Sequence, residues 1–302
     1  MIQPYEIMAF AAAVVVSFAM MLTKRAYAEG AKQNHILIGT TVYQPFIYLF
    51  LFLLSGETTV SWGQSHWTLV YSALLSIGMV IGFTSIKMGD ASIISPIMGS
   101  KVVFVAIGTY IFSIGVMSQE VIIGVVLCVV SIILLGIEFK KTDIEKQDKY
   151  GKDILLPIML ALIAITFLGF SDLVIQEKAP AMNKLVFLLV GSTTTAAIFL
   201  IKGFATGVRI NTAPKSAKKW IWLSGATNGG AGLILGLAIA YYGHATEFNI
   251  IMGSRGVLSV IAVALFANAL KLKEGQKSTA TLIMRLIGSV CILIATVLVL
   301  GE

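Results

Sequence analysis

Long uninterrupted runs of apolar residues alternate with short polar connections along the whole chain. Five runs precede the midpoint and five follow it, and each is close to the length of about 20 residues that a helix needs to cross a bilayer. Because the runs are continuous, they predict helices, whereas barrel strands alternate over about 10 residues. The expected fold class is an all-α membrane protein with ten transmembrane helices. The runs extend over Ile7 to Leu22, Ile36 to Leu54, Leu69 to Ile86, Ser92 to Ile114, Val121 to Ile137, Leu155 to Ile175, Leu185 to Ile201, Ile221 to Ala240, Phe248 to Ala267 and Thr281 to Leu300.

The composition supports a chain that is surrounded by lipid. Of its 302 residues, 57% are hydrophobic and 12% are charged, against about 25% charged residues in a soluble domain. This excludes soluble enzymes, nucleic-acid-binding proteins and disordered proteins. Cys128 and Cys291 lie inside apolar runs, which is typical of small buried hydrophobic residues and not of a disulfide framework.

The basic residues in the connections gather on one side of the predicted membrane. The connections after the first, third, fifth, seventh and ninth runs hold 17 Lys and Arg residues, whereas the other connections hold only Lys178 and Lys184. Since cytoplasmic loops are rich in Lys and Arg, this bias puts the odd-numbered connections in the cytoplasm and both termini outside. We expect a multi-pass protein of a bacterial inner or plasma membrane.

The two halves of the chain resemble each other. Gly78 to Phe104 aligns without a gap with Gly232 to Leu258 at an offset of 154, and nine of 27 positions are identical. Both segments contain Ile-Met-Gly-Ser followed by a cation, which is Lys101 in one and Arg255 in the other. Because each half has an odd number of spans, the second copy enters the membrane from the opposite side, as in secondary transporters with a substrate site near the midplane. We expect two five-span repeats at 1–139 and 154–302, joined by a basic linker at 140–153.

Two cations are predicted near the middle of the membrane. Lys101 lies nine residues after Ser92 and Arg255 seven after Phe248, and a cation at that depth costs several kcal/mol unless it meets water or a partner. They predict a polar central cavity in which the pair binds a carboxylate or phosphate, with Arg able to make a bidentate contact. The alternatives are a structural ion pair or snorkelling to an interface. Further candidate substrate-binding residues are Ser100, Ser254, Asn228 and Tyr71.

Two acids within the spans are candidate charge partners or carriers of a coupling proton. Asp172 lies near the end of the sixth span, and Glu247 begins the ninth, eight residues before Arg255. Helix capping or solvation at the interface is the alternative for each. The first half has no carboxylate in its spans. Lys101 therefore has either to reach across the repeat interface or to meet water and ligand in a cavity.

Matched glycines indicate close helix packing. Gly78 and Gly82 form a Gly-x-x-x-Gly pair, and Gly232 and Gly236 form the equivalent pair in the second half. Such pairs let membrane helices approach closely. Gly39 likewise corresponds to Gly191, at an offset of 152.

No pattern of an enzyme or a motor is present in the sequence. His35, His66 and His244 lie at span ends without metal-ligand spacing, and the chain has no Gly-rich phosphate loop. We expect no enzymatic activity, no cofactor, no metal and no nucleic-acid partner. The expected partners are a small-molecule substrate and membrane lipid, while a coupling proton or Na⁺ and a homodimer remain open.

Ten spans in two inverted halves, a basic linker between them, and glycines in the fifth and tenth spans resemble the drug/metabolite transporter superfamily, specifically its EamA-type members. The resemblance covers essentially the whole chain, although the Gly-Glu motif after the fourth and ninth spans appears only loosely, as Ser118-Gln119-Glu120 and Lys273-Glu274-Gly275. It implies a central cavity lined by the first, third, fourth, sixth, eighth and ninth spans. In the phosphate-translocator branch, basic residues on the fourth and ninth spans hold the substrate phosphate, and Lys101 and Arg255 lie on the corresponding spans. Many members are described with cytoplasmic termini, unlike the charge count here.

The expected function is secondary active transport of a small polar metabolite by alternating access, with an anionic metabolite favoured by the paired cations. An exporter of amphipathic amines, drugs or amino acids is an alternative. A channel, a receptor or another non-transporting membrane protein of the same fold is a second. A membrane enzyme acting on lipids is the least favoured, because the clustered acids or histidines that it needs are not seen.

The charge bias makes a prediction about orientation. A cysteine introduced between Lys140 and Asp153 should stay unlabelled by a membrane-impermeant thiol reagent in intact cells and should react after permeabilisation, because that connection is expected in the cytoplasm. Labelling in intact cells would show that the orientation is opposite to the predicted one.

Overall fold

The structure, a computed structural model, describes residues 3–57, 59–89, 91–112, 118–136, 147–266, Leu270 and nine residues between 283 and 298. Every regular element in this part of the chain is a helix. Six helical stretches within it are long and apolar enough to cross a membrane. An all-helical chain with several membrane-length helices is therefore confirmed. The six stretches are Pro4–Ala28, Gln33–Ser55, Trp62–Met88, Leu155–Met182, Lys184–Thr206 and Lys215–Tyr242.

The six stretches coincide with the predicted first, second, third, sixth, seventh and eighth spans. The second is interrupted after Thr41, because Pro45 in the first turn of the next helix has no N–H to donate. Their helices are α1 (Pro4–Ala28), α2 (Gln33–Thr41), α3 (Gln44–Ser55), α4 (His66–Met88), α8 (Gln147–Met182), α9 (Lys184–Thr206) and α10 (Lys215–Tyr242), with short 3₁₀ turns η1 (Trp62–Gln64) and η3 (Ile210–Thr212). The fifth predicted span contains α7 (Gln119–Gly136), and the tenth lies mostly outside the described residues. Helix α8 begins inside the predicted linker, of which residues 140–146 lie outside the described residues.

The predicted fourth and ninth spans are each divided into two helices at the same place. The first comprises α5 (Ala91–Gly99) and α6 (Lys101–Phe112), and the second comprises α11 (Ala245–Gly253) and α12 (Arg255–Phe266). Every bound of the first pair is 154 lower than its counterpart in the second.

Each break falls at the Gly-Ser of the shared Ile-Met-Gly-Ser segment. Glycine has a low helix propensity. The following serine N–H donates to the carbonyl three residues earlier, Ser100 to Ile97 and Ser254 to Ile251, both at 3.0 Å, which is the tighter 3₁₀ pattern. A helix with a cation at its first position therefore starts again beyond each break.

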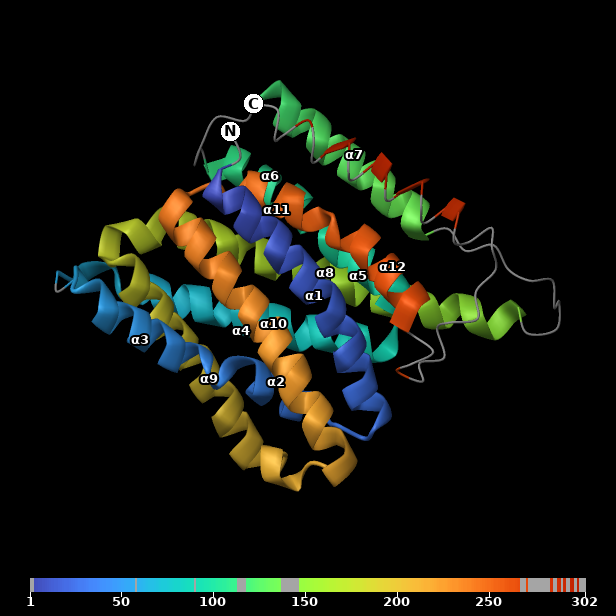
Figure 1. Cartoon of the computed structure of the whole chain (residues 1–302), viewed down its shortest axis with the longest axis horizontal. Helices are drawn as coiled ribbons and strands as arrows, with labels where there is room; N and C mark the ends of the chain where they lie inside the picture. Colours follow the sequence, from blue (N-terminus) through green and yellow to red (C-terminus); the bar gives the residue numbers. More distant parts are fainter. Residues whose placement is uncertain are drawn as a thin grey trace.

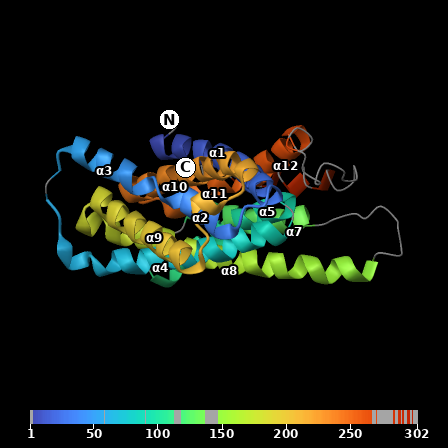
Figure 2. The same ribbon diagram turned by 90° about the horizontal axis from the view of Figure 1, so that it is seen from below.

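The long helices pack in equivalent pairs from the two halves of the chain. Helices α1 and α10 form one of the two most extensive contacts, and α4 and α8 form the other. Figure 1 shows α1 and α10 side by side, and Figure 2 shows that α4, α8 and α9 form a layer on the other side of the bundle. Helix α7 lies at the margin, in contact with α5, α6 and α11.

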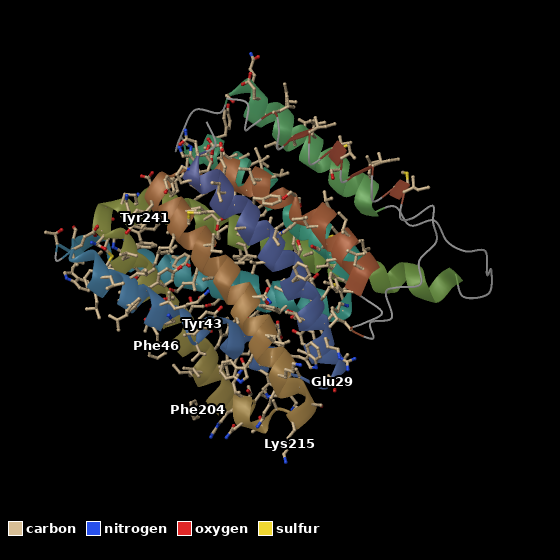
Figure 3. The ribbon with its side chains drawn as sticks, in the orientation of Figure 1. Glu29, Tyr43, Phe46, Phe204, Lys215 and Tyr241 are labelled. Atoms are coloured by element: carbon tan, nitrogen blue, oxygen red, sulfur yellow. The ribbon has the colours of Figure 1, made fainter. Side chains whose placement is uncertain are left out.

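The two ends of the bundle differ in their side chains. At one end the Tyr5 ring stacks on His244 with a centroid distance of 4.9 Å. At the other end the Arg25 guanidinium lies 5.7 Å from the centre of the Trp220 ring. Figure 3 shows Glu29 and Lys215 at this second end and Tyr241 at the first. The basic residues at the helix ends there are Lys24, Arg25, Lys32, Lys87, Lys202, Arg209, Lys215, Lys218 and Lys219.

The closest backbone approach joins α2 and α10. A Cβ atom on Gly225 would lie 2.3 Å from the carbonyl oxygen of Gly39, so only glycine fits there. The counterpart of Gly39 in the second half, Gly191 on α9, also lies at a helix crossing, where a Cβ atom would stand 2.5 Å from the Tyr71 ring of α4. The equivalent crossings of the two halves thus both depend on glycine.

The four glycines predicted to pack helices have different surroundings. A Cβ atom would lie 2.8 Å from Leu168 at Gly78 and 2.8 Å from the Tyr48 hydroxyl at Gly236. At Gly82 and Gly232 it would approach only the ends of flexible side chains, at 3.3 Å and 3.0 Å. Gly78 has the clearest packing role of the four, because its Cβ position meets both the Leu168 side chain and, at 3.2 Å, the Ala164 carbonyl oxygen of α8.

The Gly39–Gly225 contact predicts a sharp difference between two glycines of α10. Gly225→Ala should lower the free energy of unfolding by about 1 to 3 kcal/mol, because the methyl group would meet backbone atoms. Gly230→Ala is the matched control, since nothing lies within 4 Å of its Cβ position. Thermal unfolding of the purified variants measures both. Equal melting temperatures would show that the α2–α10 contact can open without cost.

Candidate functional site

A cavity of about 170 Å³ lies in the middle of the bundle. Its walls come from both halves of the chain, chiefly from α1, α4, α8 and α10 and from the broken spans. Along α4 it extends from Tyr71 to Ile86, which corresponds to about 22 Å at the rise of an α-helix. Nine of the predicted site residues line it, namely Lys101, Arg255, Asp172, Asn228, Tyr71, Gly78, Gly82, Gly232 and Gly236.

Lys101 and Asp172 form a buried ion pair in the cavity wall. The Lys101 Nζ atom donates to Asp172 Oδ2 at 2.6 Å, and the Asp172 side chain is 2% exposed. The same oxygen accepts a hydrogen bond from Asn249 Nδ2 at 2.8 Å. Asn249 is held in turn by the carbonyl of Ala245 at 2.8 Å. One carboxylate on α8 therefore connects α6 of the first half with α11 of the second.

The position of Lys101 explains how this pair forms. Because the helix restarts at Lys101, the side chain leaves the first turn of α6 and faces α8, which packs closely on α6. The sequence left two options open for Lys101. In the structure Lys101 pairs with Asp172, an acid in the other half of the chain. The resulting pair still borders the cavity.

Arg255 occupies the equivalent position in the second half but has no comparable acid. Within the described part of the chain it forms no ion pair, and its buried Nε atom has no hydrogen-bond partner. Asp172 acts on it only at longer range. Thr40 Oγ1, also in the cavity wall, is likewise buried without a partner. Buried charges are almost always paired, whereas the guanidinium of Arg255 is, among the described residues, an uncompensated charge in the cavity wall.

Three of the predicted site residues lie outside the cavity wall. Ser100 Oγ donates to the carbonyl of Ile97 at 2.6 Å, and Ser254 Oγ is buried without a hydrogen-bond partner. Glu247 lies 3.2 Å from His244 Nδ1 at the end of the bundle, with its side chain 28% exposed. Its position fits the interfacial alternative.

Asn228 and Tyr71 border the cavity from opposite sides. Asn228 Nδ2 donates to Thr23 Oγ1 at 3.1 Å and to the Ser224 carbonyl at 2.9 Å, which ties α10 to α1. The Tyr71 ring lies 5.7 Å from Phe187. Both side chains thus contact neighbours from other helices.

Several wall residues were not among the candidates from the sequence. Thr40, Gln44 and Ser171 are polar positions inside apolar runs, and this exception to the pattern could have marked them. The methionines of the wall carry no signal in the sequence, because apolar residues surround them.

If the Lys101–Asp172 ion pair is buried, the loss of Asp172 should destabilise the protein far more than the loss of an acid at the surface. Asp172→Asn should lower the free energy of unfolding by about 3 to 5 kcal/mol, since it leaves Lys101 buried without a counterion. The double variant Lys101→Met/Asp172→Asn should recover much of this loss, and the control Glu247→Gln should change little. Chemical unfolding of the four proteins measures these differences in stability. An Asp172→Asn variant as stable as the parent would show that the pair is not buried in the folded protein.

No protein-family model matches the chain, and no curated protein matches it either. A solved structure described only as "Crystal structure of protein" resembles it with a TM-score of 0.63 over 97% of this chain and 96% of that one, at 13% sequence identity. At that identity the likeness shows the fold alone: the helical arrangement of nearly the whole chain recurs in a solved protein.

Proposed function

We propose that the chain is a secondary active transporter that moves a small anionic metabolite across a membrane by alternating access. The observation that carries this proposal is the central cavity, in which the buried guanidinium of Arg255 has no counterion among the residues that the structure describes. A cation at membrane depth is costly and marks a substrate or ion pathway in many membrane proteins. A bound anion would supply the missing counterion.

The two broken spans support a transport role. In secondary transporters the substrate site is commonly built from discontinuous helices at the interface of two inverted repeats. Here both breaks border the cavity through the cation that follows them. The breaks also touch each other, since a Cβ atom on Gly99 would lie 3.6 Å from the Gly253 carbonyl oxygen. The proposed architecture is two inverted five-span repeats of the EamA type in the drug/metabolite transporter superfamily.

The charges at the two ends of the bundle favour one orientation. The end with Lys24, Arg25 and Lys215 carries most of the basic residues of the connections, so it belongs in the cytoplasm. The end with Tyr5 and His244 then faces outward. In this orientation Tyr48 and Tyr71 line the outward part of the cavity, and Phe83 and Ile86 line the inward part.

An exporter of amines is the second candidate, because Asp172 supplies an acid in the same cavity. The 2.6 Å contact with Lys101 already neutralises that acid. An amine would have to displace a buried lysine that is tethered to the protein. The unpaired group is a cation, and this favours an anionic substrate.

Counterflow in proteoliposomes tests the proposal. Vesicles loaded with an unlabelled carboxylate or phosphate ester should concentrate traces of the same labelled compound for at least one member of a panel of such anions. Arg255→Ala should abolish this uptake, and Arg255→Lys should retain a weakened uptake because the bidentate geometry is lost. Lys215→Ala, which removes an exposed cation from the end of the bundle, is the control and should transport normally.

Two outcomes would contradict the proposal. The first is uptake that survives Arg255→Ala unchanged in a protein with normal melting. The second is counterflow of amines with none of the anions, which would favour the exporter of amines.

A further inference from the structure

The charged groups in the cavity wall carry one net positive charge. Lys101, Asp172 and Arg255 are the charged residues of the wall among those that the structure describes. Lys101 and Asp172 cancel, with 2.6 Å between their charged atoms. Arg255 forms no ion pair there. The sequence suggests two cations for the ligand, whereas the geometry leaves one.

This charge balance discriminates between classes of ligand. A net charge is costly in the low-dielectric interior of a membrane protein. A monoanion brings the occupied cavity to zero net charge. A dianion leaves one negative charge, a zwitterion leaves the original positive charge, and an amine raises it to two.

The position of Arg255 shows where the anionic group fits. Arg255 lines the cavity, is 8% exposed and forms no ion pair among the described residues. The planar guanidinium can give two parallel hydrogen bonds to a carboxylate. A carboxylate therefore matches both the charge and the donor geometry at this place.

Much of the remaining wall is apolar and adaptable. Four methionines line the cavity, one each from α1, α4, α5 and α11, and methionine fits apolar groups of different shapes. Leu75, Ile175 and Leu235 add branched aliphatic surface. A fully hydrated ion would gain nothing from this wall, whereas a hydrocarbon chain or ring would be desolvated by it. The methionines are Met20, Met79, Met98 and Met252.

We propose that the cavity binds an amphipathic organic monoanion, with one carboxylate held by Arg255 and an apolar body held by the methionine-rich wall. This inference rests on the proposed function and narrows its substrate class. A cavity of about 170 Å³ has room for a small organic acid.

A set of probes with the same six-carbon chain isolates the effect of charge. Hexanoate, adipate, 6-aminohexanoate and hexylamine carry net charges of −1, −2, 0 and +1 at neutral pH. Ligand-dependent thermal stabilisation of the purified protein gives their relative affinities. Hexanoate should stabilise the protein and bind at least about tenfold more tightly than the other three. Acetate, which has the same charge without the apolar chain, should also bind at least about tenfold more weakly.

Variants tie the selectivity to the site. Arg255→Gln should remove the preference for hexanoate, whereas Arg255→Lys should retain the preference with lower affinity. Lys215→Gln removes an exposed cation far from the cavity and should bind hexanoate like the parent protein. If Arg255→Gln does not yield folded protein, the comparison of Arg255→Lys with Lys215→Gln still tests the assignment.

Three results would overturn the inference. They are no stabilisation by hexanoate, binding of adipate, 6-aminohexanoate or hexylamine as tight as that of hexanoate, and unchanged hexanoate affinity in Arg255→Lys. Counterflow of the same probes separates this inference from the proposed function. If hexanoate binds but shows no counterflow, the monoanion site is supported and transport of this acid is contradicted. If adipate or hexylamine shows counterflow, transport is supported and the monoanion site is contradicted.

Discussion

The contact between Lys101 and Asp172 determines much of the architecture around the cavity. Neither group is stable alone at that depth, so α6 and α8 have to present them to each other. Asn249 adds α11 to the same carboxylate. One buried carboxylate thereby holds together three helices from both halves, and these helices form part of the cavity wall.

The helix breaks make this contact and the cavity compatible. A continuous helix through residues 91–112 would satisfy its backbone groups with its own hydrogen bonds, and the helical repeat would fix the direction of Lys101. The Gly-Ser breaks give each cation the first position of a new helix. Both breaks lie against each other, and the cations that follow them line the same cavity. The polar centre is thus a consequence of the same four-residue segment used twice.

Much of this arrangement could be predicted from the sequence, and the missing parts have a physical explanation. Continuous apolar runs identify membrane-length helices because the bilayer sets their length. The offset of 154 identified the two equivalent cations. The choice of Asp172 as the partner of Lys101 depends on how α6 and α8 cross, and hydropathy contains no information about that crossing. The helix breaks were also not predicted, since the Gly-Ser steps lie inside runs that are apolar on both sides.

The two matched cations differ in their partners, because Lys101 has a carboxylate beside it and Arg255 has none among the described residues. The charge in the cavity wall is therefore distributed unequally between the two halves. Helix α1 packs against α10 as α8 packs against α4, but it carries no acid between Ile7 and Leu22 that could serve Arg255 as Asp172 serves Lys101. The helix breaks match between the two halves, while the charges beside them do not. A bound anion would consequently find its counterion on the second half of the chain, so the two halves would contribute unequally to ligand binding.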